Sequence, residues 1–189
     1  MARKNTDPIR MTANIEGDFA VFITGMRVNQ FWKIHKWLPN MSAMRKIIPV
    51  LAENREYGAL GGQVWYSLRG LLLIVYFRSV EQMEFFANDP NAPHAEAWRA
   101  FFRRISKNKR EVGVWHETYV VRDGEYEAVY AFMPKPTGLG SVRDAWVPVQ
   151  HKGDKAALRR AAGARAAAER ATAEANGHGD LTVAATADS

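Results

Sequence analysis

The sequence predicts an α+β fold in which two helices cover one face of an antiparallel sheet and a second subunit covers the other. Apolar strand-like segments alternate with segments of helical period along the chain. The first strand is apolar on both faces, so both faces need a cover. Two helices can shelter only one face, and the remaining apolar surface favours a homodimer. The expected order is ferredoxin-like, β-α-β-β-α-β with an extra C-terminal strand, paired into a dimeric α/β barrel.

The first half of the chain supplies a strand, a helical stretch and a hairpin. Residues 1–17 are polar and are expected to form a loose arm before a domain spanning 18–150. Apolar residues from Phe19 to Ile23 predict the first strand. From Asn29 to Tyr57 the period is helical, and Pro39 and Pro49 are expected to kink or restart the helix. One apolar face is expected, formed by Phe31, Ile34, Leu38, Met44, Ile47, Ile48 and Leu51. Residues 63–67 and 71–77, joined by a Gly-containing turn, predict a hairpin.

The second half supplies a helix and two strands. Ser79 with Gln82 three residues later indicates a capping box at a helix start. This helix is interrupted by Pro90 and Pro93 and is expected to resume near His94. Residues 112–121 predict a strand, Asp123-Gly124 a tight turn, and residues 126–133 a returning strand. Residues 151–189 are rich in Ala, Arg and Glu, which is typical of disorder or of a solvated helix.

Composition excludes several classes of function. The chain has no cysteine, which rules out disulfides, thiolate nucleophiles and cysteine-ligated metals. The net charge is +6, but the densest basic run, residues 103–110, lies at a predicted helix end, where cations suit the helix dipole. We therefore expect no nucleic-acid partner. The longest apolar run, Leu71–Phe77, is too short for a membrane span, and a cytoplasmic protein is expected.

Four segments resemble one known family. They are residues 10–13, 25–37, 98–104 and 113–119, and the most specific are Phe-Trp-Lys-Ile-His-Lys-Trp and Trp-His-Glu-Thr-Tyr. The family consists of monooxygenase-like domains similar to a fungal monooxygenase of fumagillin biosynthesis. The resemblance covers roughly residues 10–140. It implies a dimeric α/β barrel related to antibiotic-biosynthesis monooxygenases, some of which oxidise apolar substrates without a cofactor, whereas other proteins of the wider fold bind haem. A role in secondary metabolism would follow.

The strand at 112–121 carries the main candidates for catalysis. His116 and Glu117 are neighbours, so they point to opposite faces of the sheet. Either side chain, if buried in a pocket, would have a shifted pKa and could act as acid or base. Either could also be a polar core residue satisfied by its neighbours. Arg27 follows the first strand, where it could orient a polar substrate group or form an ion pair with Glu117.

Aromatic residues and one further histidine are candidates for binding. Trp65, Tyr76, Trp98 and Tyr119 are expected to line a substrate pocket, although aromatic residues at these spacings more often form core. His94 shares a helical face with Trp98 and could ligate haem, as in the haem-binding proteins of this fold, or could simply cap the helix after Pro93. His35 lies between lysines and is expected to be exposed. The cofactor is therefore none or haem.

Three functions are compatible with these residues. The first is a monooxygenase that oxidises a small apolar metabolite in a pocket between the sheet and the partner subunit. The second is a non-redox dehydratase or isomerase that uses His116 and Glu117 as acid and base. The third is a dimer that holds haem or another apolar ligand without turning it over. No Gly-rich dinucleotide loop, Walker loop, paired-His zinc motif or Gly-x-Ser-x-Gly elbow is found.

Overall fold

The centre of the molecule is a four-stranded antiparallel sheet in the order β3-β4-β2-β5. The structure is a computed structural model that describes residues 10–90, 95, 99–100, 103, 106–107, 110–149 and 155–185, the last ten without side chains. The strands are β2 (Phe19–Val28), β3 (Ala59–Ser67), β4 (Gly70–Phe77) and β5 (Val112–Val121). Helices connect β2 to β3 and follow β4, and this connectivity with this strand order is ferredoxin-like. The predicted fold class is confirmed.

The helices begin and end where the sequence gives a reason. The stretch predicted at 29–57 divides into α1 (Ile34–Arg45), α2 (Ile47–Glu53) and the short 3-10 helix η1 (Arg55–Tyr57). Pro39 lies inside α1 and does not end it, so the helix does not restart there as expected. Pro49 falls in the first turn of α2, where a missing N–H costs nothing. The next helix, α3 (Val80–Asn88), begins at Ser79, whose Oγ accepts a hydrogen bond from the Gln82 N–H at 3.2 Å. Gln82 Oε1 has no partner among the described residues, so the reciprocal half of the capping box is not formed.

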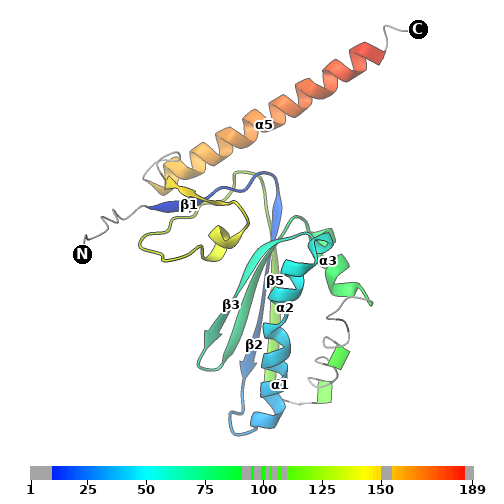
Figure 1. Cartoon of the computed structure of the whole chain (residues 1–189), viewed down its shortest axis with the longest axis vertical. Helices are drawn as coiled ribbons and strands as arrows, with labels where there is room; N and C mark the ends of the chain where they lie inside the picture. The colour runs from blue at the N-terminus through cyan, green and yellow to red at the C-terminus, as the bar shows by residue number, and fades with distance from the viewer. Residues whose placement is uncertain are drawn as a thin grey trace, which may run out of the picture.

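Helices α1, α2 and α3 pack on one face of the sheet (Figure 1). We call it the helix face. The core there consists of apolar side chains from β2 and β4 and from the helices, among them Met26, Leu73, Phe77, Met44, Leu51 and Phe86. The apolar face expected for this stretch is right at Met44, Ile47 and Leu51, which are buried. It is wrong at Ile34 and Leu38 on α1, which are 54% and 50% exposed. The side of α1 that carries Trp37, Met41 and Met44 meets the sheet instead.

The opposite face of the sheet is partly covered by the chain itself. We call it the open face. A second, two-stranded sheet joins β1 (Met11–Ala13) to β6 (Trp146–Pro148), and residues 126–145 connect it to β5. Together they bury one end of the open face in a second apolar cluster that contains Ile15, Phe19, Tyr76, Val142 and Ala145. The other end of the open face remains uncovered among the described residues.

This cover corrects two expectations. Residues 11–15 are not a loose arm, because they contain β1 and because Ala13 and Ile15 are 1% and 5% exposed. Residues 126–133 do not form a returning strand. The turn at Asp123-Gly124 is present, but after it the chain crosses onto the open face instead of pairing with β5. Tyr126 and Tyr130 direct their rings into the second cluster, and Tyr130 forms one isolated bridge with Met11.

The Ala-rich tail contains a long helix, α5 (Ala156–Ala185), that extends away from the rest of the molecule (Figure 1). The helical alternative expected for this tail is therefore the one observed. Its first turns contact the turn after β5, where Arg159 pairs with Glu127 and Arg170 with Asp123. In the described part of the chain, no helix is long and apolar enough to cross a bilayer.

Candidate functional site

The two candidate acid–base residues lie on opposite faces of β5. Thr24 on β2 pairs with His116, and Ile23 pairs with Glu117. Directly paired residues of antiparallel strands point to the same side, so His116 shares the helix face with Thr24 and Leu73. Glu117 shares the open face with Ile23 and Ile74. One substrate within a single subunit therefore cannot contact both side chains across the sheet.

His116 lines a pocket of about 450 Å³ between the sheet and the helices. Its walls come from β2, β4, α2 and α3 and are mostly apolar: Phe22, Ile47, Leu51, Leu73, Val75, Phe77, Met83 and Phe86. Apolar positions at a period of two on the strands and of three to four on the helices converge on this space, which explains its character. Its volume and lining are those of a site for a small apolar molecule.

Besides His116, the polar side chains that line this pocket are Thr24, Glu84, Asn88 and Thr118. Thr24 Oγ1 donates to the main-chain oxygen of Trp115 at 3.0 Å, and Thr118 Oγ1 lies 3.7 Å from Met83 Sδ. The imidazole of His116 lies against the ring of Phe22, with ring centroids 5.9 Å apart. No hydrogen bond of this imidazole is found among the described residues, and His116 is exposed rather than buried. It is therefore free to accept a proton from a bound molecule or to donate one.

The open face carries the other candidates of β5. Tyr119 donates a hydrogen bond to Glu117 Oε2 at 2.6 Å. That hydrogen bond, followed by the charge of Glu117, raises the pKa of Tyr119 above its ordinary value. Both side chains are exposed, so this pair is accessible to solvent or to a partner surface.

Two tryptophans lie on the uncovered end of the open face. Trp65, Leu72, Gly25 and Trp115 form one row across the four strands. Trp65 and Trp115 are 44% and 45% exposed. Gly25 leaves room for the Trp115 indole, because a Cβ at Gly25 would lie 2.6 Å from Nε1 of that ring. Trp65 and Trp115 therefore form an aromatic surface on the uncovered end of the open face.

Arg27 is also on the open face, but it is remote from Glu117. It pairs with Gly113, which lies four residues before Glu117 on β5, a separation of about 13 Å along the strand. An ion pair between them is not among the interactions of the described residues, and Glu117 takes its hydrogen bond from Tyr119 instead. The two therefore do not form one polar cluster.

Tyr76 lies under the covered end of the open face. It is 7% exposed and packs in the second cluster with Phe19, the ring centroids being 6.5 Å apart. Burial raises the pKa of Tyr76 to about 12. Its surroundings are core, and it lines neither the His116 pocket nor the aromatic surface of Trp65 and Trp115.

The remaining expected site residues do not join either group. His94 and Trp98 lie outside the described residues, so haem ligation by His94 stays a hypothesis. His35 is exposed on α1. Among the described residues, no three His, Asp or Glu side chains are grouped as metal ligands.

Sequence reasoning missed Phe22, Thr24, Met83 and Phe86 as pocket residues. Phe22 and Thr24 had a usable signal, since strand alternation puts them on one face. The residue pattern did not indicate which face of β5 joins them.

The comparisons with known proteins agree with this fold. Residues 19–139, more than half of the chain, match the sequence profile of the Monooxygenase af470-like family. Monooxygenase af470 of Aspergillus fumigatus is 31% identical over 100 residues, which make up 50% of this chain and 34% of that protein. This chain thus matches about a third of the length of that curated relative.

Two solved structures are similar in backbone. Aldoxime dehydratase OxdRE, crystallised with butyraldoxime, has a TM-score of 0.57 and 16% identity, covering 86% of this chain and 46% of that one. This likeness shows the fold. SnoaB of Streptomyces nogalater, a cofactor-independent oxygenase, has a TM-score of 0.38 and 16% identity, covering 56% of this chain and 94% of that one. Because residues 19–139 match the profile of that family, this chain belongs to the Monooxygenase af470-like family.

Proposed function

We propose that this protein is a monooxygenase-like enzyme that binds a small apolar molecule in the pocket between helices and sheet. The observation that carries the proposal is the combination of apolar walls with one uncommitted imidazole, that of His116. Family membership supports the oxygenase part. The pocket differs in position from the one expected from sequence, which lay between the sheet and a partner subunit.

The composition of the pocket favours a substrate that enters uncharged. A carboxylate group among Phe22, Leu73 and Phe77 would lose its hydration, and Glu84 in the pocket lining would repel it. A neutral molecule with one weakly acidic proton suits the pocket better. His116 would then act as the general base that takes this proton.

Proton removal makes the substrate electron-rich, which favours its reaction with O2. When a CH2 carbon is oxidised to a carbonyl, one oxygen atom enters the substrate and the other leaves as water with the two hydrogens. The substrate supplies all the electrons, so this reaction needs no other reductant. His116 returns its proton to the departing oxygen.

We further propose that a second copy of the chain covers the uncovered end of the open face. Trp65 and Trp115 on this surface supply the large aromatic area that is enriched at subunit interfaces. Glu117, Tyr119 and Arg27 surround them and would meet the partner. A site between subunits is the second candidate location for the substrate, supported by the Glu117–Tyr119 hydrogen bond.

Two other functions are less well supported. A dehydratase or isomerase that uses His116 and Glu117 together needs both side chains at one substrate, and they lie on opposite faces of the sheet. A dimer that binds an apolar ligand without turnover would use the same pocket as the enzyme. It would differ from the enzyme only in catalysing no reaction. Uptake of O2 distinguishes such a dimer from an enzyme.

The test is to measure O2 consumption with a panel of small phenols and ring ketones that carry an acidic CH or OH. We expect a compound that is turned over and gains oxygen by mass spectrometry. The His116→Ala and His116→Gln variants should then lose activity by at least about 100-fold, the usual contribution of a general base.

His35→Ala is the matched control, since His35 is an exposed histidine on α1, away from the pocket. It should retain wild-type activity. Turnover that survives in both His116 variants would contradict the role of His116. Binding of panel compounds without any O2 uptake would favour the non-enzymatic alternative.

A further inference from the structure

We propose that the cleft between η1, β3 and residues 141–144 binds an amphipathic acid, with its anionic head group at a cluster of arginines and a short apolar tail in the adjoining hollow. This site is separate from the His116 pocket and does not depend on the proposed oxygenase function. The ligand class is a carboxylate or phosphate ester with a short hydrocarbon chain.

The cleft consists of two hollows that adjoin. The larger is about 560 Å³ and is lined by Arg55, Arg78 and Arg143 among others. The smaller is about 240 Å³ and is lined at its inner end by Ile48, Leu51 and Val75. Both include Arg55, Ala59, Leu60 and Arg143 in their walls, so one molecule can reach from the first into the second.

The arginines of the larger hollow are available to an anion. Arg55 and Arg143 are exposed, and neither forms an ion pair within the described part of the chain. Arg78 donates to the main-chain oxygens of Glu16 and Asp18, at 2.7 and 3.2 Å, which fixes its position without neutralising its charge. Guanidinium groups bind carboxylate and phosphate oxygens in pairs, which suits such a head group.

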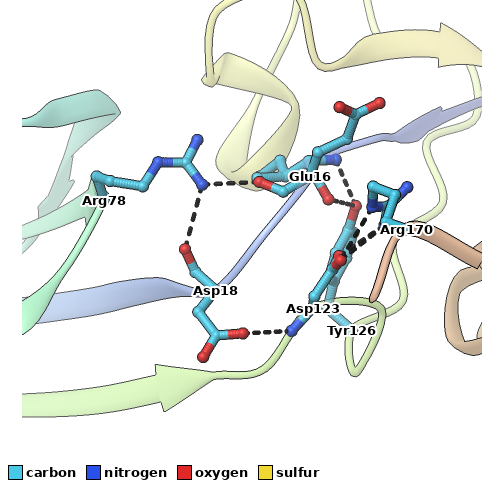
Figure 2. A network of polar contacts seen from close by, with 7 residues as sticks. Glu16, Asp18, Arg78, Asp123, Tyr126 and Arg170 are labelled. Atoms are coloured by element: carbon cyan, nitrogen blue, oxygen red, sulfur yellow. Dashed lines mark hydrogen bonds and ion pairs between the residues drawn. The ribbon is translucent and has the colours of Figure 1, made fainter. Parts of the chain in front are cut away.

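Two carboxylates also lie in the cleft and reduce its positive charge. Glu16 and Asp144 line the larger hollow together with the three arginines, which leaves one excess positive charge. Figure 2 shows that Arg78 contacts the main-chain oxygen of Glu16, while the carboxylate of Glu16 points away from it. Among the described residues, neither carboxylate is paired with an arginine of the cleft. The guanidinium groups therefore keep free donors.

The wall that carries Arg143 is held against β3 by main-chain contacts. The Arg143 N–H donates to Leu60 O at 3.2 Å. Gly61 allows this close approach, because a Cβ there would lie 2.7 Å from Ser141 O. One wall of the cleft is thus built by the segment that covers the open face, and these contacts fix the main chain at Arg143 against β3.

The smaller hollow explains why an apolar tail is expected. Ile48, Leu51 and Val75 offer only hydrocarbon surface, and burying a tail there removes apolar area from water. Leu51 and Val75 also line the His116 pocket, and they are 3% and 2% exposed. The smaller hollow and the His116 pocket therefore adjoin at these two buried side chains.

Isothermal titration calorimetry of the full chain tests this inference with octanoate and octyl phosphate as probes and acetate as the head group alone. We expect one site for an octyl probe and at least ten-fold weaker binding of acetate. Arg55→Gln and Arg143→Gln should each weaken octanoate binding several-fold, and the double variant should abolish it. Binding should also weaken as NaCl is raised, because the arginines are solvent-accessible.

Arg160→Gln is the control, since Arg160 is an exposed arginine on α5 outside the cleft. Ala52→Trp fills the smaller hollow from an exposed position on α2 and should weaken octanoate binding without changing the thermal midpoint. Octanoate binding by the folded double arginine variant at wild-type strength would overturn the inference. So would equal affinity for acetate and octanoate, or octanoate binding that Ala52→Trp leaves unchanged.

Discussion

Among the described residues, Tyr76 is one whose ionisation is strongly affected by burial. Its hydroxyl lies in the cluster under residues 126–145, and burial raises its pKa to about 12, from 10.0 in the unfolded chain. A raised pKa means that the folded state holds this proton more tightly than the unfolded state does. The stability gained is complete below pH 10 and is lost as the pH rises toward 12.

We predict that the free energy of unfolding falls between pH 9 and pH 11 by about 1 kcal/mol more in wild type than in Tyr76→Phe. Urea titrations at the two pH values measure the difference. Tyr66→Phe serves as the control, because Tyr66 is 61% exposed on β3. Equal pH dependence in wild type and Tyr76→Phe would show that Tyr76 is not buried by the covering segment.

At the residue scale, part of the candidate site could be predicted from the sequence. Alternation along β5 predicts that His116 and Glu117 point to opposite faces of the sheet, and the pairing with β2 confirms it. The same alternation does not say which side faces the helices, because Val114 and Thr118 look no more buried than Trp115 and Tyr119. That choice depends on pairing with Thr24, which is a long-range contact.

The helix α5 is attached by polar contacts. Asp123 accepts hydrogen bonds from Arg170 Nη2 and Nε at 2.7 and 3.0 Å, and Tyr126 donates to Ile15 O next to it (Figure 2). Gly163 packs against Gly124, where a Cβ on Gly163 would lie 2.8 Å from Gly124 O. Large apolar residues are nearly absent from this helix, so its docking depends on these contacts and on the ion pair between Arg159 and Glu127.

We predict that Arg170→Gln releases α5 from the turn after β5. The bidentate pair with Asp123 is partly buried, so its loss should cost about 1–2 kcal/mol of local stability. Hydrogen exchange of residues 156–175 should accelerate roughly ten-fold, while exchange in β2 and β4 stays unchanged. Arg165→Gln, an exposed arginine on the same helix, is the control and should exchange like wild type.

A second prediction for this helix concerns the substitution Gly163→Ala. Alanine favours a helix by up to about 1 kcal/mol over glycine, yet its methyl group would collide with main-chain atoms of the turn. We therefore expect more helix by circular dichroism together with faster exchange of the Gly124 amide. Unchanged exchange at Gly124 would mean that the two segments do not touch.

Helices and strands are predicted correctly where the local residue pattern is strong. The hairpin of β3 and β4, the Ser79 cap and strand β5 are all predicted by residue pattern. The course of residues 126–133 is not predicted by residue pattern. An Asp-Gly turn usually connects two paired strands, so the pattern indicates a returning strand there. Here Tyr126 and Tyr130 pack their rings against the second cluster instead. This is a tertiary contact that no local sequence pattern encodes.

The whole molecule leaves one end of its sheet without a cover. The apolar surplus of the strands, which predicts a partner, is divided between the chain's own residues 126–145 and an exposed surface with Trp65 and Trp115. Residue pattern indicates the surplus correctly but does not indicate that the chain shelters part of it. The surface left for the proposed partner subunit is therefore smaller than the sequence suggested.

We predict that wild-type protein is a dimer in sedimentation velocity and that Trp65→Asp weakens the dimer at least about 30-fold, as expected for an aromatic anchor. Trp32→Asp is the control, because Trp32 is 76% exposed and lies in the loop before α1, outside the four strands of the sheet. A monomeric wild type at micromolar concentration would exclude the proposed subunit interface.

We have proposed that the small apolar molecule binds on the helix side of the sheet. An NMR titration with 1-naphthol tests it most directly, by following the His116 imidazole, identified from its loss in His116→Gln, together with the indole N–H signals of Trp65 and Trp115. We predict saturable shifts of His116 while both indole signals stay in place. Shifts of the two indole signals with an unchanged His116 signal would contradict binding beside His116. They would place the binding site on the open face.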